Sequence, residues 1–489
     1  MILSGLLLGS LISWTAFALS SSVESQKVQA IHGQSQTPLV DMSTLSETEY
    51  TMLGHPAFPR YCVRVKKSNF CDGTVNSYTG YIDIEARHLY FYFFESRADP
   101  DKDDVIFWVN GGPGGSSAMG LFMEMGPCRV VNSTHTEYHP YSWNSNANIF
   151  FVDQPVGVGY SYADYGETVT TTEEAAKDIA AFIAIFFENF SKFKGRPLHM
   201  ASESYGGRYI PVFASEVFDQ NQKLAQAGLV PVNLTSIMIG NGDTDIFTMG
   251  LSYYDKSCTA ASGSPILDIR TCIKMKQVLP RCKKWMTESC IDQFDAISCS
   301  AAVSFCEEQL IGPFSATGIS PYDITRKCEG APEKTACYFL TEDVEKYINL
   351  PETRQAMGID STAPKFNIMS MKVNSDFANT LDGLHPTYDH VAALLDRGVR
   401  VLIYVGRNDW ICNDLGNEAW TTQFDWSGHD EFASQPLREW KIDDRKAGFT
   451  RSAKGLTYVS VDGAGHMVPF DKPKESLVLV TRWLNNQEL

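Results

Sequence analysis

Short apolar runs alternate with helical patterns along this chain, and this alternation limits its fold more than any other feature of the sequence. A capping box at Thr171 and Glu174 predicts one long helix, and another is expected over 209–219 with Pro211 in its first turn. The runs expected to form strands are YTGYIDI (78–84), HLYFYFFES (88–96), VIFWV (105–109), NIFFVDQP (148–155), LHMAS (198–202), SIMIG (236–240), VLIYV (401–405) and LTYVSV (456–461). Strands that alternate with helices predict an α/β fold with a mostly parallel sheet flanked by helices.

One segment, from about 243 to 345, interrupts this alternation. It carries short helical patterns and eight of the twelve cysteines, between Cys258 and Cys337. Because no pair of cysteines is spaced C-x-x-C, we expect disulfides rather than a zinc site, and neither a metal nor another cofactor. The sequence therefore predicts a core built from 51–242 and 346–489, with a disulfide-rich cap inserted at 243–345.

The N-terminus predicts a chain that enters the secretory route. In residues 1–18 the apolar stretch is too short to span a bilayer, and Ala16-Phe17-Ala18 fits a small-x-small cleavage site. We expect a signal peptide there, with a membrane anchor as the alternative, followed at 19–50 by a loose arm or propeptide rich in Ser, Thr and Gln. The protein is expected outside the cell, with the vacuole as the alternative. Glycosylation sequons begin at Asn132, Asn189 and Asn233.

The charge of the chain excludes two classes of partner. Its formal net charge is −17, which repels nucleic-acid phosphates and anionic membrane surfaces. With 44% hydrophobic and 20% charged residues, the chain has ample material for a folded core. The sequence leaves the oligomeric state open.

The stretch SESYGGRY (202–209) joins an expected strand to an expected helix. It resembles the nucleophile elbow G-x-S-x-G, with Ser202 in place of the first glycine, so Ser204 is a candidate nucleophile. Small residues are needed here because strand and helix pass very close to each other at such a turn. Taken alone, the motif also fits an ordinary strand–helix junction.

A serine nucleophile needs a base and an orienting acid, which follow it in the order acid, then histidine, in this type of fold. His466, in VDGAGHMVP, directly follows an expected strand, whereas His429 lies in a polar segment without one. Asp409 follows VLIYVG in the same manner. We therefore favour Asp409 as the acid over Asp462, which lies four residues before the histidine on the same loop.

The glycine-rich stretch WVNGGPGGSS (108–117) is the candidate oxyanion loop. Glycines let a backbone approach the substrate, and the second N–H of an oxyanion hole comes from the residue after the nucleophile, here Tyr205. A phosphate-binding loop is the competing interpretation. It fails because no G-K-[ST] follows and a proline stands at the centre of the loop.

Four motifs in this order, WVNGGPGGSS, ASESYGGRY, GRNDWICN and GAGHMVP, resemble the serine carboxypeptidase family of α/β-hydrolase fold over roughly residues 50–489. Among its members the chain looks most similar to the secreted fungal carboxypeptidases of the S1 type. Gly115 stands where the family commonly has a cysteine, so a disulfide from this loop to the cap is missing. Ser202 stands where the family has glycine. Neither departure concerns a residue of the expected triad.

The resemblance implies roles for further residues. Those expected to hold the terminal carboxylate of the substrate, with Trp108 in support, are Asn110, the N–H of Gly111, Glu124 and Glu203. Gly112 and Tyr205 would form the oxyanion hole. Cys412 would line the pocket of the penultimate residue, and Met467 that of the leaving residue.

Glutamates are an unexpected choice for binding an anion, since Arg or Lys would normally do so. Glu124 and Glu203 become donors only when protonated, and two buried carboxyls that lie close together raise each other's pKa. Met119 and Met123 lie on the segment that carries Glu124, so we also expect them in the leaving-residue pocket, with core packing as the alternative.

These observations predict a serine-type carboxypeptidase that releases C-terminal amino acids from peptides and proteins at acid pH through an acyl-enzyme. Two alternatives stay open. The acyl-enzyme of the same fold can pass its acyl group to a hydroxyl, which would make the protein an acyltransferase. The chain can also be a binding protein on a hydrolase fold, although such proteins usually lose the serine or the histidine.

Overall fold

A single mixed sheet carries the candidate site in the computed structural model, which describes residues 40–489 apart from 165 and 331–334. Within those residues the sheet has thirteen strands, and a separate hairpin is formed by β6 (Cys128–Asn132) and β7 (His135–Tyr138). The strands of the sheet are β1 (Thr51–Gly54), β2 (Tyr61–Ser68), β3 (Ser77–Ile84), β4 (Arg87–Phe94), β5 (Val105–Val109), β8 (Asn148–Val152), β9 (Tyr162–Ala163), β10 (Pro197–Ser204), β11 (Asn233–Gly242), β12 (Arg400–Gly406), β13 (Arg438–Ile442), β14 (Arg445–Ala453) and β15 (Leu456–Val461).

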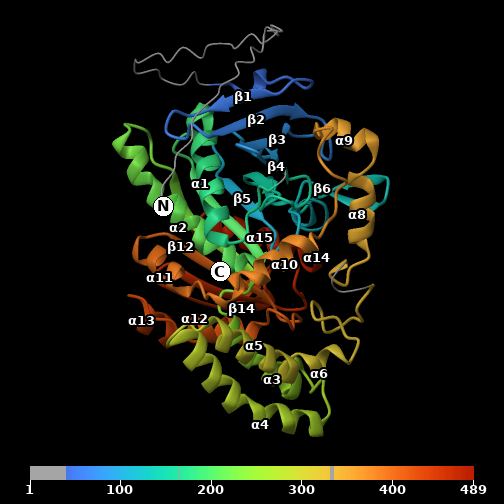
Figure 1. Cartoon of the computed structure of the whole chain (residues 1–489), viewed down its shortest axis with the longest axis vertical. Coiled ribbons are helices and arrows are strands. Elements are labelled where there is room, and N and C mark those ends of the chain that lie inside the picture. Colours follow the sequence, from blue (N-terminus) through green and yellow to red (C-terminus); the bar gives the residue numbers. More distant parts are fainter. Residues whose placement is uncertain (1–39, 165, 331–334) are drawn as a thin grey trace, which may run out of the picture. The chain divides into compact units, whose positions relative to one another are not determined.

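The middle of the sheet is parallel and both of its flanks are antiparallel. The strand order is β1-β2-β3-β4-β8-β5-β10-β11-β12-β15-β14-β13, with β9 beside β4. The neighbours from β8 to β15 run parallel, while β1 to β4 and β13 to β14 pair antiparallel. The carboxyl ends of the parallel strands therefore meet at one edge, where α/β enzymes place their ligands. The predicted α/β class is confirmed (Figure 1).

Helices cover both faces of the sheet, as the buried strands require. On one face α1 and α2 pack against each other, and α11 packs against α2. The helices are α1 (Thr172–Asn189), α2 (Gly206–Gln226), α3 (Ile246–Cys258), α4 (Ile269–Met286), α5 (Ala296–Leu310), α6 (Gly312–Ser315), α8 (Leu340–Ile348), α9 (Pro351–Met357), α10 (Met371–Asn379), α11 (Tyr388–Asp396), α12 (Asp414–Thr421), α13 (His429–Ser434), α14 (Val468–Asp471) and α15 (Pro473–Leu484).

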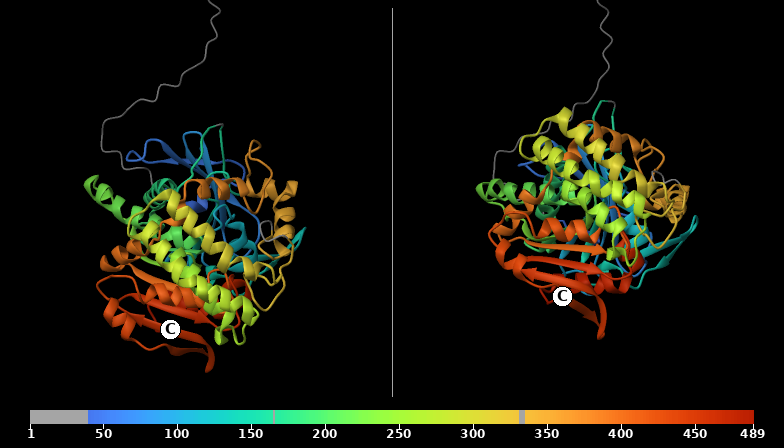
Figure 2. Two further views of the ribbon diagram at one scale, coloured as in Figure 1. Left: turned by 60° about the horizontal axis from the view of Figure 1, so that its bottom comes forward. Right: turned by 90° about the horizontal axis from the view of Figure 1, so that it is seen from below.

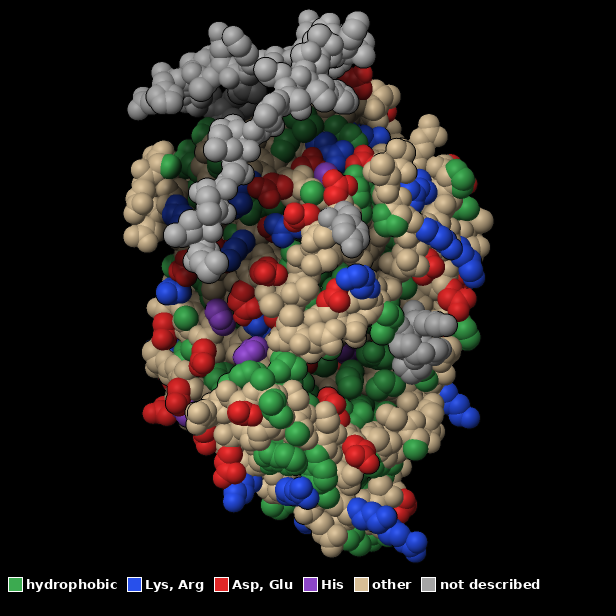
Figure 3. Space-filling model, in the orientation of Figure 1, with side chains coloured by type: hydrophobic (Ala, Val, Ile, Leu, Met, Phe, Trp, Pro, Cys, Tyr) green, Lys and Arg blue, Asp and Glu red, His purple; other side chains and the backbone are tan. Residues whose placement is uncertain are grey.

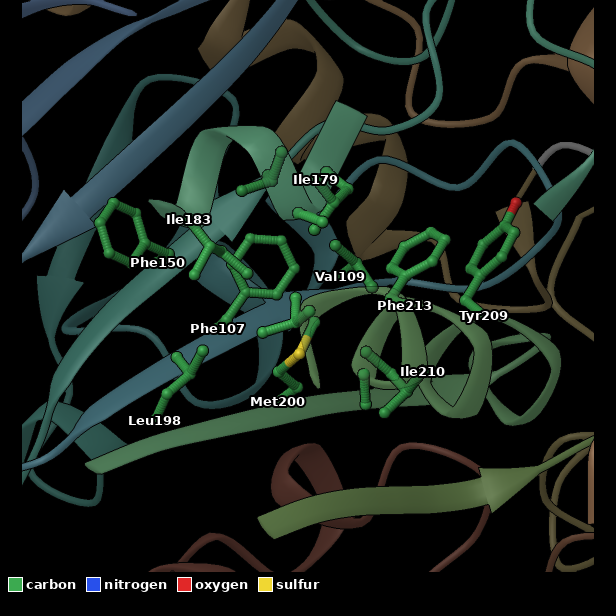
Figure 4. Packing of buried hydrophobic residues seen from close by; sticks show 14 of the residues in the cluster. Phe107, Val109, Phe150, Ile179, Ile183, Leu198, Met200, Tyr209, Ile210 and Phe213 are labelled. Atoms are coloured by element: carbon green, nitrogen blue, oxygen red, sulfur yellow. The ribbon is translucent and has the colours of Figure 1, made fainter. Parts of the chain in front are cut away.

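Alternate residues of one strand enter the two different cores. On β5, Phe107 and Val109 pack in the core beneath α1 and α2, while Ile106 and Trp108 enter the core on the opposite face. Figure 4 shows the first of these cores, where residues of both helices meet side chains of the strands. Because both faces are buried, the strand reads as an unbroken apolar run rather than an alternating one.

The helices begin near the predicted positions, with one informative difference. The side chain of Thr171 caps α1 by accepting from Glu174 N, as the sequence predicts. However, α2 begins at Gly206, so Pro211 lies inside the helix rather than in its first turn. A proline at this place leaves the carbonyl four residues earlier without its helical donor. That carbonyl, of Gly207, accepts a 2.7 Å hydrogen bond from the Thr387 hydroxyl instead.

The cysteine-rich segment forms a group of helices, α3 to α6, with its own hydrophobic cluster, and Figure 2 shows it from two further directions. All eight of its cysteines pair with one another, as Cys258–Cys272, Cys282–Cys306, Cys290–Cys299 and Cys328–Cys337. Trp410 joins this group to the core, because its ring stacks between Tyr253 at 4.3 Å and Phe314 at 4.0 Å.

The structure adds detail to two of the expected segments, while the division into core and insertion stays a prediction. The expected end of the insertion at 345 falls inside α8, which continues because Val344 and Ile348 bury one of its faces. The expected loose arm at 19–50 is packed in its described part, since Met42 and Leu45 are buried in the core. The expected signal peptide lies outside the described residues. No helix of the described part is long and apolar enough to cross a membrane.

Candidate active site

Ser204 ends β10 on a strained turn at the carboxyl edge of the sheet. Its φ is 61°, a left-handed conformation that is uncommon for a residue other than glycine and that is found at functional sites. A Cβ on Gly206 would lie 1.8 Å from Ser202 Oγ, and one on Gly207 would lie 2.6 Å from Asp243 N. The two glycines are therefore needed for α2 to start directly behind the serine.

Asp409 and His466 form a buried hydrogen-bonded pair at the same edge. Asp409 follows β12 and His466 follows β15, and these strands are parallel neighbours. Nδ1–H of His466 donates to Oδ2 of Asp409 over 2.8 Å. The rival acid Asp462 instead forms ion pairs with Arg407 and Lys446. The geometry thus provides a histidine with a fixed tautomer and an orienting carboxylate.

The end of β11 connects this pair to the serine. Asn241 donates its side-chain amide to Asp409 Oδ2 over 2.7 Å, and Asp243 N donates to the carbonyl of Ser204 over 2.8 Å. Within the described residues the Ser204 hydroxyl makes no hydrogen bond of its own. Hydrogen bonds between a nucleophile and its base are often long without substrate and tighten when it binds.

The glycine-rich loop lies directly against the elbow. A Cβ on Gly111 would lie 2.6 Å from Tyr205 N, so only glycine fits this approach, and Gly112 adopts a φ of 121°. Behind the loop, the buried carboxylate of Asp153 accepts from the Ser116 hydroxyl and from Ser117 N. The loop also lacks the family's cysteine at Gly115, and backbone hydrogen bonds to Ile368 and Ser370 hold it.

Asn110 is aimed at Glu203 by two donors on its other side. Its Oδ1 accepts from the Trp108 indole N–H over 2.7 Å and from Gly120 N over 3.1 Å. The amide nitrogen must therefore point away from them, and it donates to Glu203 Oε1 over 3.1 Å. All of these groups are buried. The arrangement places the amide of Asn110 against the carboxyl of Glu203, the residue directly before the candidate nucleophile.

Glu124 and Glu203 form a buried pair that needs a proton. If both carboxyls are ionised, they can only accept hydrogen bonds, and then neither oxygen of Glu124 has a donor. The two side chains nevertheless lie within hydrogen-bonding reach of each other. Burial first, and then each other's proximity, raises the pKa of Glu203 well above its ordinary value; burial raises that of Glu124 as well. One shared proton supplies the missing hydrogen bond and removes one of two like charges.

The guanidinium of Arg208, beside the elbow, is already paired with carboxylates. Its Nε donates to the carbonyl of Asp382, and one terminal nitrogen bonds to the carboxylates of Asp382 and Glu173. Asp382 is buried and also accepts from the Tyr205 hydroxyl and from Thr172. The arginine therefore stabilises the turn around the elbow.

The thiol and the methionines of the predicted pockets lie in different surroundings. Cys412 is buried and unpaired, and burial raises its pKa well above the ordinary range, so it stays a neutral thiol. Met467 lies in the same hydrophobic cluster as Met119 and Met123. Met123 is fully buried, and Met119 packs beside Gly115. Their part in a leaving-residue pocket stays a prediction.

Asp409, Cys412 and His466 bring their ligand atoms within 4.8 Å of one another. His466 Nδ1 and Asp409 Oδ2 are already hydrogen-bonded to each other, and Ile411 N donates to Asp409 Oδ1 over 3.1 Å. The three residues therefore fit a catalytic pair beside a thiol.

Comparison with known proteins agrees with this geometry. A model of the family described as "Serine carboxypeptidase" matches residues 70–486. The chain belongs to the serine carboxypeptidase family. It is 40% identical over 432 residues to carboxypeptidase Y of Candida albicans, covering 87% of this chain and 77% of that protein. It is 34% identical over 487 residues to carboxypeptidase Y of Komagataella phaffii, covering 94% and 90%.

A solved serine carboxypeptidase has the same fold. Kex1(delta)p, a prohormone-processing carboxypeptidase from Saccharomyces cerevisiae, matches with a TM-score of 0.73 at 23% identity, covering 86% of this chain and 95% of that one. The α/β-hydrolase fold that the sequence predicts is thereby confirmed.

One sequon of this serine carboxypeptidase does not fit the prediction of glycosylation. Asn189 is buried at the end of α1, and its amide donates to the carbonyls of Gly54 and Ile185, so no glycan fits there. A sequon is defined by three residues in sequence and does not tell whether its asparagine is buried in the fold. Asn132 and Asn233 are exposed, and their glycosylation stays a prediction.

Sequence reasoning missed the residues that support the site from behind. Asp153 directly follows β8, and Asn241 lies at the carboxyl end of β11, just after the apolar run SIMIG. This position at the carboxyl edge of the parallel sheet was the available signal. Asp382 had no such signal, because it lies far along the chain between helices and reaches Tyr205 only through the fold.

Proposed function

We propose that this serine carboxypeptidase releases single amino acids from the free C-terminus of peptides and proteins. The observation that carries the proposal is the buried cluster of Asn110, Glu124 and Glu203, because Glu203 directly precedes Ser204 in the chain. A group that binds the terminal carboxylate beside the nucleophile aligns the last peptide bond with it. Endopeptidases and esterases have no use for such a cluster.

In the proposed reaction, Ser204 Oγ attacks the carbonyl carbon of the last peptide bond while His466 Nε2 takes the hydroxyl proton. Asp409 holds the histidine in the tautomer that has Nε2 free, and stabilises the imidazolium that forms. The N–H groups of Gly112 and Tyr205 bind the developing oxyanion.

His466 then gives its proton to the nitrogen of the leaving residue, which departs as a free amino acid. The acyl-enzyme on Ser204 is attacked by water, whose proton passes to His466 and then back to the serine oxygen. We place the leaving side chain beside Met467, with Met119 and Met123 behind it, and the penultimate side chain beside Cys412.

We further propose that the enzyme works best at acid pH, in an oxidising compartment outside the cytosol. The raised pKa values of Glu124 and Glu203 favour the first point, since the pair donates to a carboxylate only while it holds protons. The five disulfides within the described residues favour the second. We propose peptides and proteins with a free C-terminus as the substrates, and the net charge of −17 disfavours nucleic acids.

The test is quantitation of the amino acid released from an N-blocked dipeptide, from its C-terminal amide, and from the dipeptide in the presence of an alcohol. At pH 5 we expect release from the free acid at a kcat/KM at least about tenfold above that for the amide, which is about 1.4 kcal/mol. In the presence of the alcohol we expect hydrolysis to remain the main reaction. Equal rates on acid and amide would refute exopeptidase action, and predominant ester formation would make the protein an acyltransferase.

A further inference from the structure

A cavity of about 170 Å³ opens beside Cys412 under the helices of the cysteine-rich segment. Its walls are mostly apolar and come from α3, α4 and α5, with Ile246, Phe247, Met286 and Leu310 among them. A cavity of about 150 Å³ holds a benzene ring, so this one has room for a single side chain. In Figure 3, where this segment lies in the lower part of the picture, hydrophobic side chains are interspersed with both acidic and basic ones.

Two carboxyls interrupt the apolar lining of the cavity, those of Asp243 and Glu307. Asp243 directly follows β11, and its backbone N–H bonds to the Ser204 carbonyl, so it lies immediately next to the nucleophile. Its Oδ1 is buried and has no hydrogen-bond partner. Within the described residues neither carboxyl forms an ion pair with a lysine, an arginine or a histidine.

Glu307 lies where this cavity meets a second hollow. It is accessible to solvent but surrounded by protein, and it lines both spaces. The second hollow is also lined by Pro113 and Tyr205, which belong to the oxyanion loop and the elbow. Glu307 therefore borders both the cavity beside Asp243 and the hollow that reaches the oxyanion loop and the elbow.

Asp243 as a whole is half-buried, but its Oδ1 is buried without a partner. Such an unpaired carboxylate oxygen is costly, and proteins keep one mainly where a ligand or a reaction uses it. Burial, followed by the nearby Asp245 and Glu307, raises the pKa of Asp243 to about 7. A cation entering the cavity would satisfy the free oxygen and relieve the repulsion between the two acids. The apolar walls would contact the methylene stem of a lysine or arginine side chain while its charged end meets the acids.

We propose that Asp243 and Glu307 form a cation-binding site for the side chain of the substrate's penultimate residue, so that peptides with Lys or Arg in this position are preferred. This specificity rests on the proposed carboxypeptidase function and on the position of Cys412, which lies beside both the cavity and the Asp409–His466 pair. The apolar walls alone would suit leucine or phenylalanine, and that preference is the competing outcome.

The preference should depend on pH, because only ionised carboxylates attract a cation. The titratable groups that face Asp243 are Asp245, which caps α3, Tyr253 of α3, Glu307 of α5 and the Cys412 thiol, and none of them is a cation. The folded enzyme holds Asp243 protonated at acid pH, so the preference for lysine is smallest there. It should increase as the pH rises toward neutrality and Asp243 ionises.

The experiment compares N-blocked dipeptides with the same C-terminal residue and either lysine or norleucine in the penultimate position. The two side chains share a carbon chain of the same kind and differ in the charged amine. For the wild type we expect the kcat/KM ratio of lysine over norleucine to exceed one and to rise at least about tenfold between pH 4.5 and 7, since the ionised fraction of a carboxyl rises about tenfold per pH unit below its pKa. Asp243→Asn should reduce the ratio at pH 7 by at least about tenfold, and Glu307→Gln by less.

Glu308→Gln is the matched control, because Glu308 is exposed on α5 next to Glu307 and lines neither space. It should leave the ratio unchanged. A ratio that Asp243→Asn leaves unchanged would overturn the proposal, and so would a wild-type ratio below one at every pH, whether or not the variant folds. Both of these results leave the carboxypeptidase function intact. A wild type that hydrolyses neither dipeptide would instead refute the proposed function.

Discussion

The side-chain amide of Asn241 donates a 2.7 Å hydrogen bond to Oδ2 of Asp409. The same oxygen accepts the Nδ1 proton of His466, so Asn241 fixes the carboxylate that in turn fixes the base. The side-chain oxygen Oδ1 of Asn241 accepts from Gly406 N over 3.0 Å, which holds the end of β12 against the end of β11. The histidine is thus oriented by two neighbouring strand ends as well as by its own loop.

The first prediction concerns this support. Asn241→Ala should lower kcat by about ten- to a hundredfold with little change in KM, because the residue acts through the base and not on the substrate. Steady-state kinetics on an N-blocked dipeptide checks it. In an Asp409→Asn background the same change should cost much less, since the two act as one unit. Fully additive effects of the two changes would contradict the account.

The second prediction concerns the pair Glu124 and Glu203. Because both carboxyls have raised pKa values, the pair holds a proton above the usual range for glutamate and loses it as the pH rises. KM for a peptide with a free carboxylate should therefore rise on the alkaline side of that titration. KM for a blocked ester should stay flatter, because an ester has no carboxylate to bind.

Glu203→Gln removes one titrating group and keeps a donor. The variant should lose some peptidase activity at acid pH and show a weaker rise of KM with pH. The measurement is KM against pH for wild type and variant on the same dipeptide. Parallel curves would show that the pair does not sense the carboxylate.

The third prediction concerns the buried network around Asp382. Tyr205→Phe deletes a 2.7 Å hydrogen bond to a buried carboxylate and should lower the free energy of unfolding by about 1.5–3 kcal/mol. Asp382→Ala should cost about 3–5 kcal/mol, because it removes the buried partner of Arg208 and leaves this buried cation only the more exposed Glu173. Denaturant unfolding gives both values. Glu173→Ala is the control at the exposed end of the network and should cost at most about 1 kcal/mol. If Asp382→Ala were as mild as the control, the network would not stabilise the elbow.

The fourth prediction concerns glycosylation. Peptide mass spectrometry of the protein secreted from a fungal host should find glycans on Asn132 and Asn233, which are exposed, and none on Asn189. Asn189→Gln should leave the glycan mass unchanged and destabilise the protein, since it disturbs the hydrogen bonds to Gly54 and Ile185. A glycan on Asn189 would mean that this end of α1 is open when the chain is modified.

The sequence predicts most of the sheet and the positions of the triad, because each depends on local pattern. Buried strands read as apolar runs, and Ser204, Asp409 and His466 each follow such a run, so their common edge follows from the parallel order. The carboxyl terminus of the insertion could not be found in this way. The composition does not change sharply around residue 345, and in the structure this residue lies inside α8.

The supporting residues are also invisible to local pattern. Asp382 lies 177 residues from Tyr205 in the chain and meets it only in the fold, where Phe377 of α10 packs against Tyr205 and Tyr209. The burial of Asn189 has the same origin, because Gly54 reaches it from a strand far earlier in the sequence. Such contacts depend on how helices lie on the sheet, and a single sequence does not record that placement.

The most direct test of the central claim is the rate at which purified Ser204→Ala releases the C-terminal residue of an N-blocked dipeptide. The account predicts a kcat at least about 10⁴-fold below that of the wild type, because removing one member of a catalytic triad disables the others. A fluorophosphonate probe should label the wild type on Ser204 and leave the variant unlabelled, while both unfold at the same denaturant concentration. A folded Ser204→Ala protein that kept a tenth of the wild-type rate would contradict the assignment of Ser204 as the nucleophile.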